Sequence, residues 1–177
     1  MIALTPALAV AGRDFAVAGL TLGVMFYFSL ESIRISGIEI PFFSDVVRKA
    51  SRRRDTGHFV LGPVTLGAGA MFSLLLFPES AANMAIYALA FGDGFSSLIG
   101  RIFGRIRPAF LFGKSVEGSI ACFFCILLSS WCVCRDMKAS LATAAAATVC
   151  EALPLGDYDN IVIPLAAGFA AKFSLGI

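Results

Sequence analysis

The chain has 177 residues, of which 58% are hydrophobic and only 15% carry a charge, whereas an ordinary soluble domain is about half apolar and about a quarter charged. The mean hydropathy is +0.86, and the apolar residues occur in long blocks rather than in the alternation typical of strands. This composition excludes a soluble globule and predicts helices in a lipid bilayer. The net charge of +2 says little by itself, and no nucleic-acid partner is expected.

The predicted elements begin with a short N-terminal segment, which ends at Asp14 and lacks the basic start of a signal peptide. Six apolar runs follow, and each is a candidate transmembrane helix. We therefore predict an all-α fold, a polytopic integral membrane bundle of about six transmembrane helices that forms a single domain over residues 1–177. The candidate spans are 15–34, 57–77, 80–100, 116–134, 138–153 and 160–176.

Basic residues are concentrated in two of the connections. Two predicted spans separate these connections, so they lie on the same side of the membrane, which the positive-inside rule makes cytoplasmic. Two further predicted spans separate the second basic connection from the acidic connection 153–160, which therefore lies on the same side. We therefore predict an integral protein of the cell inner membrane with its site facing the cytoplasm. The basic residues are Arg48, Lys49, Arg52, Arg53 and Arg54 in the first connection, and Arg101, Arg105, Arg107 and Lys114 in the second.

Asp93 lies inside the third apolar run, in the stretch FGDGFSS. A carboxylate at that depth is costly unless it is paired, hydrated or bound to a cation. Small residues at helical spacing follow it and would allow close approach by a neighbouring helix or a ligand. Two interpretations stay open, a buried aspartate bonded to another helix or a functional site. The small residues are Gly94, Ser96, Ser97, Gly100 and Gly104.

The stretch GKSVEGS, residues 113–119, directly precedes the fourth apolar run. A helix that starts here would bring free backbone N–H groups and Lys114 together, which favours a phosphate site. It is not a P-loop, because the GxxxxGK[ST] spacing is absent. A simpler interpretation makes Ser115 an N-cap and Glu117 a first-turn acid.

Carboxylates flank the last connection, EALPLGDYDN, residues 151–160. Mg²⁺ is usually held by one or two carboxylates together with substrate phosphates. Asp159 and Asn160 could therefore complete a magnesium site with Asp93, whereas Asp157 is more simply a turn residue. Glu151, at the end of its run, is our candidate for the group that accepts a proton from a hydroxyl substrate.

Together these segments resemble the CTP-dependent lipid-alcohol kinases, which include dolichol kinase, phytol kinase and the diacylglycerol kinase that uses CTP. The likeness extends from Glu31 to Leu165 and includes ESIRI, residues 31–35, where Glu31 and Arg34 could simply pair on one helix face. It implies CTP as donor and a polyprenol, diacylglycerol or phytol-type alcohol as acceptor. Mg²⁺ would be the cofactor, held by Asp93, Asp159 and Asn160.

The resemblance and the residue chemistry give one set of candidate site residues. The catalytic candidates are Asp93, Lys114, Glu151 and Asp159. The nucleotide-binding candidates are Ser97, Gly100, Arg101, Gly104, Gly113, Lys114, Ser115, Glu117, Gly118 and Ser119.

Two other functions stay open. The first two segments also look like phosphatidate cytidylyltransferases, but the later Lys-Asp and His-Gly-Gly elements of that family do not follow Ser119. A small membrane transporter could instead use Asp93 as an ion relay. The chain is also minimal for the kinase family, so a partner chain, such as a second copy, could supply a further helix.

Overall fold

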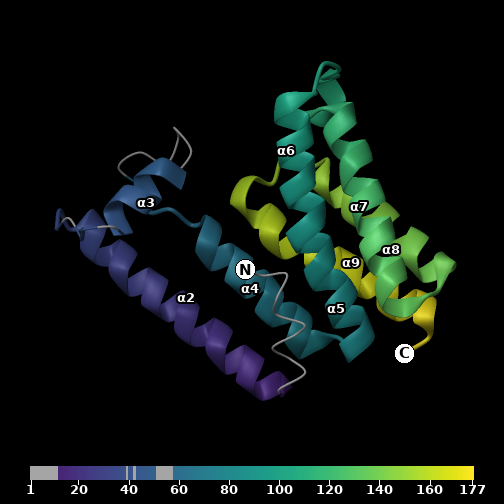
Figure 1. Ribbon diagram of the computed structural model, residues 1–177, viewed down its shortest axis with the longest axis horizontal. Coiled ribbons are helices and arrows are strands. Elements are labelled where there is room, and N and C mark those ends of the chain that lie inside the picture. Colours follow the sequence, from purple (N-terminus) through teal and green to yellow (C-terminus); the bar gives the residue numbers. More distant parts are fainter. Residues whose placement is uncertain (1–11, 39, 42, 51–57) are drawn as a thin grey trace.

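The structure is a computed structural model that describes residues 12–38, 40–41, 43–50 and 58–177. Every regular element within these residues is helical, which confirms the predicted all-α class (Figure 1). The predicted N-terminal segment, up to residue 11, and Arg52 to Arg54 of the first basic connection lie outside the described residues. The α-helices are α2 (Arg13–Ile35), α3 (Phe43–Ala50), α4 (Gly62–Leu76), α5 (Glu79–Tyr87), α6 (Gly94–Ile102), α7 (Val116–Cys134), α8 (Met137–Glu151) and α9 (Asp159–Leu175).

Two of these helices, α2 and α7, are long and apolar enough to cross a membrane, and α4 is apolar but shorter. By this criterion the prediction of about six transmembrane helices is not confirmed. Helix α4 falls short of the about 20 residues that a bilayer core requires. Helices α8 and α9 are also short and, unlike α4, do not count among the shorter apolar helices. The third predicted span is divided among three helical segments. Membrane association itself agrees with the composition.

Helix α9 holds the bundle together, because it packs against α4, α5 and α8, while α7 packs against α6 and α8. Helix α2 lies at the edge and contacts α4 (Figure 1). Small side chains let these backbones approach closely, as is usual between membrane helices. The buried alanines are Ala16, Ala70, Ala81, Ala82, Ala85, Ala88, Ala139, Ala144, Ala147, Ala167 and Ala171. Large apolar side chains of α2 instead point outward, and those of Phe15 and Leu22 are each 68% exposed.

A π-helical segment, η3 (Ala88–Asp93), joins α5 to α6, so that the three form one continuous rod (Figure 1). Its i→i+5 hydrogen bonds widen the turn and rotate the residues that follow, and such segments are frequent at functional sites. Gly92 allows this segment to lie against α7, because a Cβ there would be 2.6 Å from Ile126 Cδ1. The segment ends at Asp93, and its geometry sets the direction in which that carboxylate points.

The end of α2 is attached to the chain before α4 through Glu31, which is fully buried. Its carboxylate accepts hydrogen bonds from Arg34 Nε at 2.8 Å, from Arg34 Nη2 at 2.6 Å and from the Val60 N–H at 2.9 Å. Arg34 also donates to the His58 carbonyl at 3.0 Å. The predicted pairing of Glu31 with Arg34 is confirmed, and it holds the end of α2 against the chain before α4.

The substitution Glu31→Gln tests this attachment. It keeps the shape of the side chain but removes the charge, so we expect a loss of about 1–3 kcal/mol of stability, seen as a lower Tm of the purified protein in detergent. Glu79→Gln, at the exposed start of α5, is the control and should leave the Tm unchanged. An equal Tm for both variants would show that Glu31 does not hold α2 in place.

Candidate active site

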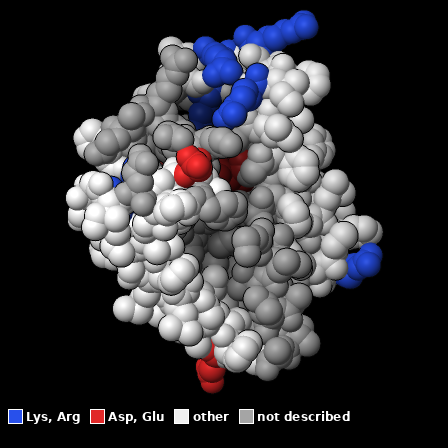
Figure 2. Space-filling view, turned by 60° about the vertical axis from the view of Figure 1, so that its left-hand side comes forward, with Lys and Arg blue, Asp and Glu red and all other residues white. Residues whose placement is uncertain are grey.

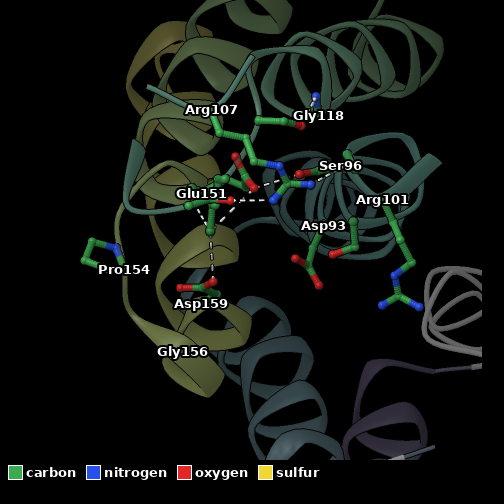
Figure 3. Close-up of a pocket in the computed structure, with 14 residues that line it drawn as sticks. Asp93, Ser96, Arg101, Arg107, Gly118, Glu151, Pro154, Gly156 and Asp159 are labelled. Carbon is green, nitrogen blue, oxygen red and sulfur yellow. Dashed lines mark hydrogen bonds and ion pairs between the residues drawn. The ribbon is translucent and has the colours of Figure 1, made fainter. Parts of the chain in front are cut away.

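A cavity of 530 Å³ lies where α6, α7, α8 and α9 meet, and residues from all three segments singled out in the sequence line it (Figure 3). The connection before α7 and the turn before α9 complete its walls. The lining residues are Asp93, Ser96, Ser97, Gly100, Arg101, Arg107, Gly113, Lys114, Ser115, Gly118, Glu151, Pro154, Gly156 and Asp159.

Lys114 lies between two acidic residues in this cavity. Its Nζ donates to Asp159 Oδ2 at 3.1 Å and to the backbone carbonyl of Glu151, and it lies 3.4 Å from Glu151 Oε1. The preceding residue, Gly113, has a φ of +91°, a conformation that glycine adopts at little cost. This turn directs Lys114 inward, so the sequence GK provides both the bend and the cation.

Glu151 is the last residue of α8 and only 3% exposed. Its Oε1 accepts a hydrogen bond from Ser96 Oγ at 2.6 Å, and its Oε2 accepts one from Ser119 Oγ at 3.3 Å. A buried polar group is costly unless it is hydrogen-bonded, and these two hydroxyl groups satisfy the Glu151 carboxylate. Glu151 therefore joins α6, α7 and α8 at one point.

Asp93 and Asp159 line the cavity from separate helical segments, the end of η3 and the start of α9. Two carboxylates that face one cavity fit Mg²⁺, because substrate phosphates and water commonly complete its coordination. Within the described part of the chain, no group of three or more His, Cys, Asp and Glu side chains forms a ready-made metal site. The donor set thus fits an ion that arrives with a phosphate substrate rather than an all-protein cage.

Arginines supply the basic side of the site. Arg101 lines the cavity, and its charge is available to an anionic ligand. Arg107 is engaged, since its guanidinium donates to the carbonyl groups of Gly113 at 2.7 Å and Gly100 at 2.9 Å. Figure 2 shows basic side chains gathered at one end of the molecule beside recessed acidic side chains. This arrangement suits a polyphosphate bound with a divalent cation.

At the start of α7, more backbone N–H groups are hydrogen-bonded within the protein than the sequence suggested. Ser115 is the N-cap, as the simpler interpretation predicted, and its Oγ accepts from the Gly118 N–H at 3.1 Å. The Val116 N–H donates to the Ile106 carbonyl at 3.0 Å. Since these first-turn N–H groups bond within the protein, Lys114 and Arg101 are the cations of the cavity lining that could bind a phosphate.

Four predicted site residues, Gly104, Glu117, Ser119 and Asn160, lie outside the cavity lining. Glu117 accepts hydrogen bonds from the Arg105 N–H at 3.0 Å and the Ile106 N–H at 3.1 Å, so it fixes the connection between α6 and α7. Asn160 Nδ2 donates to α4, to the Gly62 carbonyl at 3.3 Å and to Thr65 Oγ1 at 3.0 Å. Its role as a magnesium ligand stays a prediction.

Four residues that line the cavity are absent from the predicted site set, Ser96, Arg107, Pro154 and Gly156. The signal for Ser96 was present, because it lies one helical turn after Asp93 among the small residues. Its bond to Glu151 spans 55 residues of sequence, a pairing that local sequence patterns do not reveal.

Close contact between α6 and α7 depends on glycine. A Cβ on residue 118 would lie 2.9 Å from the Ser96 carbonyl oxygen and 3.3 Å from Gly100 Cα. Both atoms belong to the backbone, so Gly118→Ala must push the helices apart and separate Ser96 from Glu151. We expect a loss of about 1–3 kcal/mol of stability, measured by thermal unfolding. Gly94→Ala, where a Cβ meets nothing within 4 Å, should be neutral, and similar melting of the two variants would contradict this account.

The fold and site together define a helical, membrane-associated protein with a polar cavity in which cationic and acidic side chains meet. The rice protein "Probable phytol kinase 1, chloroplastic" is 30% identical over 158 residues, which is 79% of this chain and 50% of the relative. "Phytol kinase 1, chloroplastic" of Arabidopsis thaliana is 30% identical over 80% of this chain, and "CTP-dependent diacylglycerol kinase 1" of Saccharomyces cerevisiae is 28% identical over 59% of it. The chain is therefore a homologue of phytol kinases and of a CTP-dependent diacylglycerol kinase, which matches the resemblance seen in its motifs.

The chain spans about half the length of the phytol kinases that it matches, with 50% and 53% of two of them covered. No family model matches the sequence. No solved structure matches it either.

Proposed function

We propose that this chain transfers the γ-phosphoryl group of CTP to the hydroxyl group of a membrane lipid alcohol. One observation carries the proposal: Asp93, Lys114, Glu151 and Asp159, far apart in sequence, line one cavity. The names of the homologues support the reaction, since two of those described above are phytol kinases and the third is a CTP-dependent diacylglycerol kinase. CTP and the type of alcohol come to this chain from those names alone.

We further propose that six helical passages cross the inner membrane, with the cavity on the cytoplasmic side. The rod formed by α5, η3 and α6 would be one passage, and α4, α8 and α9 would be three further passages. Exposed apolar side chains support this arrangement, for example Leu128 of α7 at 62% and Phe173 of α9 at 81%. The basic residues beside the cavity suit the cytoplasmic side.

The proposed mechanism assigns a task to each side chain. Lys114 and Arg101 bind the phosphates and neutralise charge that builds up during transfer. Asp93 and Asp159 would hold Mg²⁺. The ion would supply positive charge that orients the phosphate oxygens and stabilises the leaving CDP.

Glu151 would position the acceptor hydroxyl and take its proton. As the hydroxyl oxygen forms its bond to the γ-phosphorus, the bond between that phosphorus and the bridging oxygen of CDP breaks. The hydrogen bonds from Ser96 and Ser119 hold the Glu151 carboxylate in place. The products are a lipid monophosphate, CDP and a proton on Glu151 that returns to water.

The direct test uses membranes that contain the protein, CTP labelled on its γ-phosphorus and a lipid extract. We expect label in a lipid monophosphate. A CDP-lipid with released pyrophosphate would instead identify a cytidylyltransferase, and absence of both products would leave the transporter interpretation. Parallel reactions with labelled ATP measure the choice of nucleotide.

A further inference from the structure

A second cavity, of 340 Å³, lies beside the first turns of α7. It lies on a different face of this helix from the 530 Å³ cavity, which we call the polar cavity. Most of its wall is apolar, and it includes Ile120, Phe123 and Phe124 of α7. Ser119 of α7 and Thr148 of α8 are the polar residues among those that line it. We call it the apolar cavity.

The apolar cavity meets the proposed active site at one carboxylate. Ser119, in its wall, donates to Glu151 Oε2 at 3.3 Å, and Glu151 lines the polar cavity. Thr148 lies three residues before Glu151 on α8, one turn of the same helix. Glu151 thus stands between a cavity suited to phosphates and a cavity suited to hydrocarbon.

The apolar cavity is also accessible from outside the bundle. Ile120 is 51% exposed and Phe124 is 54% exposed, and both lie on α7, a helix long and apolar enough to cross a membrane. A hydrocarbon chain could therefore enter sideways from the lipid without passing through water, which apolar surface disfavours.

We propose that the apolar cavity binds the hydrocarbon chain of the acceptor alcohol, so that its hydroxyl group reaches Ser119 and Glu151. This inference rests on the proposed kinase function and specifies where its second substrate binds. The volume lies near the lower end of the range for ligand cavities. The cavity is shallow and open to the outside of the bundle, so it holds only the part of the chain next to the hydroxyl, and the remainder stays in the bilayer.

Photo-crosslinking tests the inference without requiring catalysis. The full chain in phosphatidylcholine vesicles is irradiated with a C20 isoprenoid alcohol, or with diacylglycerol, carrying a diazirine near its hydroxyl group. Peptide mapping should place the label on residues 116–124 and around Thr148. Competition by the unmodified alcohol shows specific binding, and the more heavily labelling probe identifies the preferred acceptor. Label only on other helices, or label that is not competed, would overturn the inference.

Kinetics of one matched pair of variants add a second measurement. Ile120→Trp fills the apolar cavity, whereas Leu128→Trp adds the same bulk two turns further along α7, outside the cavity lining. We expect Ile120→Trp to raise the KM for the alcohol by about tenfold without changing the KM for CTP, and Leu128→Trp to change neither. Equal KM values for the alcohol in both variants would refute this binding site.

The two measurements separate this inference from the proposed function. Cross-linking at the apolar cavity in a protein that phosphorylates no lipid would support the lipid site and refute the kinase. Lipid phosphorylation by a protein that is labelled elsewhere would support the kinase and refute the lipid site.

Discussion

Asp93→Asn should reduce the rate of lipid phosphorylation by about 10²–10³-fold, a loss typical for removal of one preorganised charge-stabilising group. Asparagine has nearly the same shape as aspartate, so the fold should persist, but its neutral amide is a poor Mg²⁺ ligand. The measurement is turnover with labelled CTP across a range of magnesium concentrations. We expect the variant to need more Mg²⁺ for half-maximal rate and to stay slow at saturation.

The matched control for this prediction is Asp14→Asn, an exposed aspartate in the first turn of α2. It carries the same chemical change away from the cavity lining and should keep the wild-type rate. A thermal melt shows whether each variant is folded. Wild-type turnover by a folded Asp93→Asn variant would remove Asp93 from the site.

The sequence predicted the helices best where their ends carry strong local signals. The predicted run 116–134 coincides with α7, because Ser115 caps its first turn and Arg135, in a left-handed conformation, ends its last. The run 57–77 was predicted too long, since α4 begins at Gly62, with a proline in its first turn. Hydropathy alone does not distinguish a helix from the apolar residues that precede it.

The assembly of the site was predictable in outline, because membrane topology places alternate connections on the same side. That reasoning brought Asp93, Lys114 and Asp159 toward one face, and all three line the same cavity. Topology could not predict individual hydrogen bonds. The π-helical turn before Asp93 and the hydrogen bond from Ser96 to Glu151 depend on how α6 and α8 pack, which no short stretch of sequence encodes.

The same limit explains Asn160 and Glu117. Both belong to the predicted site, and the sequence offered another role only for Glu117, as an acid in the first turn of its helix. In the fold, Asn160 bonds to α4 and Glu117 bonds to backbone N–H groups of the connection between α6 and α7. A polar residue near a site either binds the ligand or forms hydrogen bonds with the surrounding protein, and only the three-dimensional contacts distinguish these roles.

Lys114→Ala should lower kcat by about 10²–10³-fold and raise the KM for CTP, because Lys114 is the cation placed between Glu151 and Asp159. Removing it should also cost about 1–3 kcal/mol of stability, since two carboxylates of low exposure lose a shared positive charge. The measurements are initial rates at varied CTP and thermal unfolding without nucleotide. Lys138→Ala, an exposed lysine in the first turn of α8, is the control and should change neither.

The double variant Lys114→Ala with Asp159→Asn separates the two effects of this lysine. Neutralising Asp159 relieves the charge left by the loss of Lys114, so the Tm should recover relative to Lys114→Ala alone, a non-additive result typical of residues in contact. Turnover should not recover, because the double variant lacks both a phosphate-binding cation and a proposed Mg²⁺ ligand. Recovery of turnover together with the Tm would show that Lys114 only balances the charge of Asp159 and has no part in phosphoryl transfer.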